Sequence, residues 1–210
     1  MKCFLIALSA LSLLVGGPSA RANSSVNLSA TGKITPSACE PRLSNGGEYD
    51  LGKIPAKDLN LDQPTALPVQ TLQLELTCEA LTLVALKPRD NRSGSSSDSQ
   101  YTFRFGLGRV NGNEKVGSMV LDLQSILADG NPMYAIGSEG PTGWAPTDII
   151  SPTFITSFTS SRSIPNLAPM PIQRLTADLR IAPRIAPANT LTLTKEVPID
   201  GSVTLEINYL

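Results

Sequence analysis

The sequence has 210 residues, with 17 basic side chains, 18 acidic side chains and no histidine. A formal net charge of −1 argues against a nucleic-acid-binding surface and against a polybasic membrane surface. The absence of histidine excludes Ser-His-Asp and Cys-His catalytic groups and histidine zinc sites. No calcium loop, phosphate-binding glycine loop or nucleophile elbow is present either. We therefore predict a protein that is not an enzyme, with no catalytic residues, no metal site and no cofactor.

Residues 1–22 have the features of a cleavable signal peptide. Lys2 supplies a positive charge, an uncharged and almost wholly apolar run follows over residues 3–15, and glycine and proline then break it. Ala20 and Ala22 are the small residues that a signal peptidase reads, so cleavage is expected before Asn23. The apolar run is shorter than the roughly 20 residues of a membrane-spanning helix. We expect an exported protein without a membrane span.

Two cysteines remain after this cleavage, Cys39 and Cys78. An even pair in an exported chain is typical of a structural disulfide. A redox-active pair is usually closely spaced, as in C-x-x-C, and these two residues are far apart in the sequence. We predict that Cys39 and Cys78 form a disulfide bond that stabilises the fold.

Alternation of apolar and polar residues dominates the mature chain, and helical periodicity is scarce. The candidate strands, in chain order, are residues 26–34, 49–54, 69–78, 81–86, 101–110, 119–123, 172–181, 191–194 and 203–209. The 17 prolines and 16 glycines are spread between them and supply turns. Many short strands without intervening helices indicate an all-β protein, an antiparallel sandwich or barrel.

Two stretches read as long loops. Residues 89–100 are polar and serine-rich, with little to bury, and are expected to form a mobile hairpin tip. Residues 129–147 gather glycines and prolines around Tyr134 and Trp144. An exposed aromatic ring on such a loop can stack on a sugar or contact a partner protein, so this is a candidate ligand loop. The alternative is that the rings pack at the edge of the core.

Both ends of the chain resemble chaperone–usher pilins. The N-terminal similarity lies in residues 30–39 (ATGKITPSAC), in residues 51–54 (LGKI) and in a partner cysteine on a later strand, Cys78. The C-terminal similarity lies in residues 201–210 (GSVTLEINYL), which look like the last pilin strand with its penultimate aromatic residue. The sequence is also similar to an uncharacterised family of exported proteins often encoded beside fimbrial operons.

The resemblance implies an immunoglobulin-like (pilin-type) antiparallel β-sandwich over residues 32–210, with long loop insertions and one disulfide. A pilin domain lacks its last strand, and a segment from another molecule fills the resulting groove. The short extension 23–31 is then the candidate donor strand. The resemblance assigns the donor role to Val26, Leu28, Ala30 and Gly32. It assigns the terminal strand that borders the groove to Val203, Leu205, Ile207 and Tyr209.

The implied function is that of a structural, minor or tip subunit of a surface fibre that supports cell adhesion. Its implied partners are a periplasmic pilus chaperone, the usher and neighbouring pilus subunits, with a host glycan or protein as a further candidate. The protein would pass through the periplasm to a cell-surface fimbria. Residues 23–31 are short for a donor strand, however. The alternative is therefore a self-complemented, monomeric periplasmic binding module for a carbohydrate or protein, in which residues 191–194 supply the missing strand.

Overall fold

The computed structural model describes residues 29, 38–140, 142–163 and 167–210. The chain divides into two units, residues 1–34 and residues 35–210, and the second is described here. The predicted signal peptide and, apart from Ser29, the predicted donor extension lie outside the described residues, as do Val26, Leu28, Ala30 and Gly32. Within the described ranges, no helix has the length and apolar character needed to cross a membrane.

The first sheet contains the three longest strands. Its strand order is β1 (Cys39–Leu43), β3 (Gln70–Thr82), β14 (Ile172–Ile185), β8 (Gly117–Ala128) and β12 (Ile149–Ile150). Three two-residue strands attach to this path: β2 (Thr65–Ala66) pairs with β14, and β5 (Phe105–Gly106) and β9 (Asn131–Pro132) pair with β8. All of these pairs are antiparallel.

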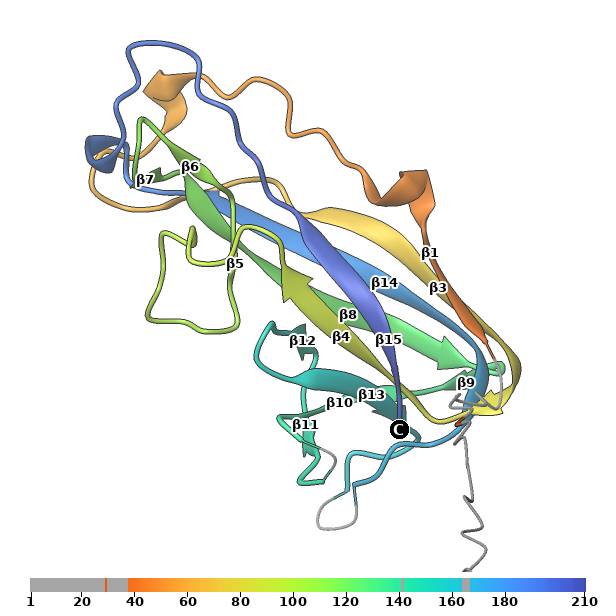
Figure 1. The fold of residues 1–210 in the computed structure, drawn as a ribbon. Coiled ribbons are helices and arrows are strands. Elements are labelled where there is room, and N and C mark those ends of the chain that lie inside the picture. Colours follow the sequence, from red (N-terminus) through yellow and green to blue (C-terminus); the bar gives the residue numbers. More distant parts are fainter. Residues whose placement is uncertain (1–28, 30–37, 141, 164–166) are drawn as a thin grey trace, which may run out of the picture. The chain divides into compact units, whose positions relative to one another are not determined.

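The second sheet lies against the first and ends on the C-terminal strand (Figure 1). Its strand order is β11 (Ala145–Pro146), β10 (Tyr134–Ser138), β13 (Ile155–Thr159), β4 (Val84–Asp90) and β15 (Val203–Tyr209), again antiparallel. A separate two-stranded ribbon is formed by β6 (Arg109–Val110) and β7 (Glu114–Lys115). The short 3-10 segments are Ser44–Gly47, Ala56–Asp58 and Ala188–Thr190.

The core lies between the two sheets and follows the period-two alternation of the sequence. In β3, Leu74 and Leu76 are buried, whereas Gln73 and Glu75 on the opposite face are exposed. Because successive side chains of a strand point to opposite faces, this strand presents one apolar face to the second sheet. The prediction of an all-β antiparallel sandwich with one disulfide is confirmed.

The two lateral sides of the sandwich differ. On one side, the segment 145–150 belongs to both sheets, because β11 pairs with β10 and β12 then pairs with β8. The hydrogen bonds Thr147 N to Ala135 O (3.2 Å) and Leu123 N to Asp148 O (2.8 Å) continue this connection, so that side is closed. On the other side, β1 and β15 are the outermost strands of their sheets, and the described residues contain no strand that joins them.

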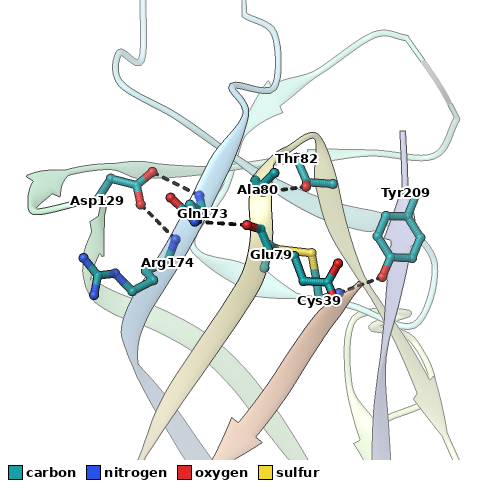
Figure 2. The surroundings of a disulfide bond; sticks show 9 residues. Cys39, Glu79, Ala80, Thr82, Asp129, Gln173, Arg174 and Tyr209 are labelled. Carbon is teal, nitrogen blue, oxygen red and sulfur yellow. Dashed lines mark hydrogen bonds between the residues drawn. A yellow bond between two sulfur atoms is a disulfide. The ribbon is translucent and has the colours of Figure 1, made fainter. Parts of the chain in front are cut away.

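The disulfide fastens β1 to the first sheet. Cys39 lies directly opposite Cys78 in the β1–β3 pair, and the two sulfur atoms are bonded. Near this end of the sheet, the carboxylate of Asp129 accepts hydrogen bonds from the backbone N–H groups of Gln173 (3.1 Å) and Arg174 (2.8 Å), as Figure 2 shows. The disulfide end of the sandwich is therefore well braced.

Three predicted strands are wrong or shortened. Residues 49–54 form no strand, because Gly52 adopts a φ of 65° and its N–H bonds the Asp50 carboxylate, which makes a turn. Residues 101–110 contain only β5 and β6, separated at Gly108, which has a φ of 88°. Residues 191–194 form no strand either.

The two predicted loops are more ordered than expected. The tip 91–104 packs onto the first sheet, where Ser95 is 4% exposed and its hydroxyl accepts a hydrogen bond from Gly108 N (3.1 Å). Of the predicted tip 89–100, residues 89 and 90 belong to β4, and Ser95 is its one buried residue. The stretch 129–147 contains the strands β9, β10 and β11, which together hold 9 of its 19 residues.

Loss of the disulfide is expected to destabilise the protein. Replacing both Cys39 and Cys78 with Ala should lower the free energy of unfolding by about 2–5 kcal/mol, the usual effect of removing such a bond from a small exported domain. Denaturant unfolding of the variant and of the unmodified protein would measure this difference. Thiol titration of the denatured, unreduced mature protein should detect no thiol, and two titratable thiols would contradict the assignment.

Candidate binding groove

The C-terminal strand β15 is paired on one side only. It pairs with β4, and no other described strand pairs with it. The hydrogen bonds Asn91 N to Ser202 O (3.0 Å) and Leu210 N to Leu83 O (3.1 Å) show that the even-numbered residues bond toward β4. In an antiparallel pair the bonded residues alternate along the strand. The N–H and C=O groups of the odd-numbered residues in 203–209 therefore point to the open side.

A hollow with an apolar base and a polar rim, here called the edge groove, lies between the first half of β15 and the end of β1, and its rim includes Glu48, Asp50, Arg92 and Asp200. Its volume is about 590 Å³. Leu43 of β1 lines one side, and Val203 and Leu205 of β15 line the other. Its base consists of buried side chains from β3, β8 and β14, namely Leu72, Met119, Leu121, Leu179 and Ile181. The base of the groove is therefore the hydrophobic core itself.

The inward-facing side chains of β15 are less covered than those of its neighbour. Leu86 in β4 is 1% exposed, whereas Leu205 and Ile207 of β15 are only half-buried against the core. The alternation of β15 places these aliphatic side chains on the core side, but none of the strands in the described ranges lies beyond β15 to cover them. This end of the second sheet has apolar surface that remains to be covered.

A second apolar cavity, of about 730 Å³, adjoins the edge groove. The two share Tyr49, Asp50 and Gly201 in their linings. The second cavity lies between residues 51–56 and residues 191–199 and reaches Leu107 and Ile185 of the core. A side chain at position 201 would force the buried Leu107 to shift, because a Cβ atom there would lie 2.7 Å from its methyl group.

The connection between the 3-10 segment η3 (Ala188–Thr190) and β15 is fastened at both ends. At its start, the Glu114 carboxylate accepts hydrogen bonds from the Thr192 N–H (2.7 Å) and hydroxyl (2.6 Å). At its end, Arg92 forms a two-pronged ion pair with Asp200 through contacts of 2.7 and 2.8 Å. The predicted role of residues 191–194 as a missing strand is therefore wrong, since Thr192 is bonded to β7 rather than to the edge of β15.

These contacts keep both carboxylates ionised. The pKa of Glu114 is lowered, chiefly because the side-chain amide of Asn111 donates to it and then because Thr192 donates to it. The pKa of Asp200 is lowered mainly by its hydrogen bond from Arg92. At neutral pH the connection therefore stays fixed beside the groove.

Beyond the lining of the edge groove, at the disulfide end, a tyrosine side chain links β15 to β1. The hydroxyl oxygen of Tyr209, in β15, accepts a hydrogen bond from the backbone N–H of Cys39, in β1, at 3.0 Å. Figure 2 shows the ring reaching from one strand toward the other beside the disulfide. The two strands that border the groove are thus linked at this end.

The described residues singled out in the sequence as sites lie in separate parts of the fold. Val203, Leu205, Ile207 and Tyr209 all lie in β15, and the first two line the edge groove. Tyr134 lies in β10, where the guanidinium of Arg162 sits 5.0 Å from its ring centroid. A surface hollow of about 490 Å³ includes Tyr134 in its lining but not Trp144. The described residues thus give no cavity shared by these two rings.

Sequence reasoning missed the groove residues outside β15. Leu43 and Tyr49 lie shortly after Cys39 in the sequence. Met119 and Leu179 belong to predicted strands that had no feature to distinguish them from other core strands. Their only signal was apolar alternation, which every core strand shares. Among the described residues, no three side chains of the metal-binding types come together.

Comparison with known proteins gives similarity without an assigned activity. A family described as "Protein of unknown function (DUF1120)" matches residues 28–102, a segment that includes β1, the disulfide and β4 but not β15. In Escherichia coli (strain K12), an uncharacterized protein called YhcF is 25% identical over 224 aligned residues, which cover 91% of this chain and 93% of YhcF. A protein of the same organism called GltF is 26% identical over 249 aligned residues, covering 96% of this chain and 94% of GltF.

Acid is expected to loosen the connection beside the groove. A carboxylate whose pKa is lowered by folding stabilises the folded state above its unfolded pKa, and this contribution is lost as the pH falls through its folded pKa. In a pH titration followed by NMR, the amide signal of Thr192 should shift with a midpoint below that of an ordinary glutamate. Glu114→Gln should remove this shift, and Glu139→Gln, at an exposed site, should retain it. A Thr192 signal that does not titrate would contradict the role of Glu114.

Proposed function

We propose that the chain is a subunit of a chaperone–usher surface fibre and that a strand from another molecule completes its sandwich. The observation that carries this proposal is the unpaired edge of β15, which borders an apolar groove whose base is the core. A strand added at this edge would bond the outward N–H and C=O groups and cover the half-buried side chains at the same time. This is β-strand addition to an exposed sheet edge.

The chain also contains a segment suited to be such a strand. Val26, Leu28, Ala30 and Gly32 recur at every second position of the mature N-terminus, as do Val203, Leu205, Ile207 and Tyr209 in β15. Matching periods allow each small or apolar residue of the donor to face the groove while polar residues face outward. A chain that has both a donor segment and a groove suits a position with a neighbour on each side.

The partners follow from the same groove. During export a periplasmic chaperone would cover it, the usher would receive the complex, and in the fibre a neighbouring subunit would take the place of the chaperone. The protein would then be found at the cell surface, in a fimbria that supports adhesion. The proposed role is structural and requires no catalytic group.

The first test is the behaviour of the mature chain expressed without a chaperone. An open apolar edge recruits strands, so the protein should form concentration-dependent oligomers or aggregate. A peptide of residues 23–34 added in trans should give a soluble one-to-one complex, measured by size-exclusion chromatography with light scattering. A monomer that stays folded after deletion of 23–31 and ignores the peptide would favour the monomeric binding module instead.

Single substitutions in the peptide and in the protein sharpen this test. Leu28→Glu in the peptide should abolish the complex, because burying an unpaired charge in an apolar groove is strongly unfavourable. Ser29→Glu, on the opposite face, is the matched control and should bind. On the protein, Leu205→Glu in the groove should prevent binding, while the exposed Thr204→Glu should permit it.

A further inference from the structure

A strand that pairs with a single edge has an open register. Sliding it by two residues keeps the same side chains directed into the groove, so alternation by itself does not choose between such positions. This applies to the donor segment, whose Val26, Leu28 and Ala30 alternate with polar residues. If the groove selects one register, a feature of the groove itself must fix it.

The opposite side of the groove offers little pairing. Glu79 N donates to Ala38 O (3.1 Å), so by alternation the N–H and C=O groups of the odd-numbered residues of β1 point away from β3. Of these residues, Pro41 has no N–H, and the N–H of Cys39 is already bonded to the Tyr209 hydroxyl. Within β1, Leu43 alone retains an N–H to donate. The incoming strand must therefore pair mainly with β15.

The two ends of the groove are unlike. At the disulfide end, the Tyr209 side chain extends from β15 to β1 and is held there by the 3.0 Å bond to Cys39 (Figure 2). At the other end, the edge groove adjoins the second cavity near Tyr49 and Gly201, so apolar space continues. An occupying strand meets a crossing side chain at the first end and further space at the second.

We infer that Tyr209 is a positioning residue that closes the space between β15 and β1 at the disulfide end, beyond the lining of the edge groove, and sets the register of the strand bound along β15. The occupant is the donor segment of a second copy of this chain, residues 26–32. This inference rests on the proposed function. The hydroxyl bond to Cys39 is what holds the ring between β15 and β1, and the strand abuts the ring and extends only toward the second cavity.

Peptides extended at one end or the other test this stop. The protein is the mature chain carrying Leu28→Glu, which disables its own donor segment and leaves the groove accessible. The core peptide is 25–32. One extended peptide is 25–34, which adds Ile34 in phase, and the other is 23–32 with Ser24→Val, which adds an apolar residue in phase at the opposite end. Fluorescence anisotropy of labelled peptides gives each dissociation constant.

With Tyr209 intact, the extension at the peptide end that points to the second cavity should tighten binding by about tenfold, the effect of covering one further aliphatic side chain. The extension at the end that abuts the Tyr209 ring should have no effect. Tyr209→Phe keeps the ring but loses the bond to Cys39, and both extensions should then tighten binding. Tyr209→Ala should behave in the same way. Tyr101→Phe, at an exposed tyrosine whose ring lies beside Phe103 and Arg104, is the matched control and should behave as the unmodified chain.

The outcomes separate the stop from the function on which it rests. If no peptide binds to any variant, the proposed strand addition fails. If the peptides bind, but both extensions change the dissociation constant equally with Tyr209 intact, neither end of the groove is closed. The proposed role of Tyr209 is then wrong. If Tyr209→Phe leaves one extension without effect, the hydroxyl bond does not hold the ring, and the inference is overturned as stated.

Discussion

Backbone hydrogen bonding at the edge of a sheet is the constraint on which this structure depends. A strand inside a sheet bonds on both sides, whereas an edge strand leaves every second N–H and C=O unpaired and attracts other strands. At other sheet edges of this fold, fewer backbone groups remain unpaired. The segment 145–150 joins both sheets along one side, and on the other side Pro41 and the occupied N–H of Cys39 reduce what β1 can offer. The edge of β15 has no such protection among the described residues.

The groove beside that edge exists because the preceding connection is held out of it. Residues 191–199 have the aliphatic side chains to cover the core, and some of them do pack against it. Glu114 at one end and Arg92 at the other fix the connection as a wall of the second cavity, however, rather than as a neighbour of β15. Among the described residues, no strand therefore covers the outer edge of β15, beside which the base of the groove is core.

Donor and groove have unequal physical roles in the proposed assembly. The alternation of the donor determines which face of the strand turns toward the groove, but not its register. The register is set by the blocked end of the space that the donor enters. A bound strand that is hydrogen-bonded on one side only can slide more easily than a strand that is hydrogen-bonded on both sides. A residue that blocks one end of the groove is therefore more important in the first case. Tyr209 can act in this way because it belongs to β15 and bonds to β1, so its ring spans the two sheets at the point where the disulfide keeps β1 in place.

Local regularities in the sequence determined the all-β class, the disulfide and the strand at 203–209. Alternation with a period of two and a pair of widely spaced cysteines can be read without knowing which segments meet. Only the tertiary structure decided that β15 is an edge, that Leu72, Met119 and Leu179 form one groove base, and that Thr192 bonds to Glu114. These facts depend on strand order and on contacts between residues far apart in the chain, and alternation is the same for a central strand as for an edge strand.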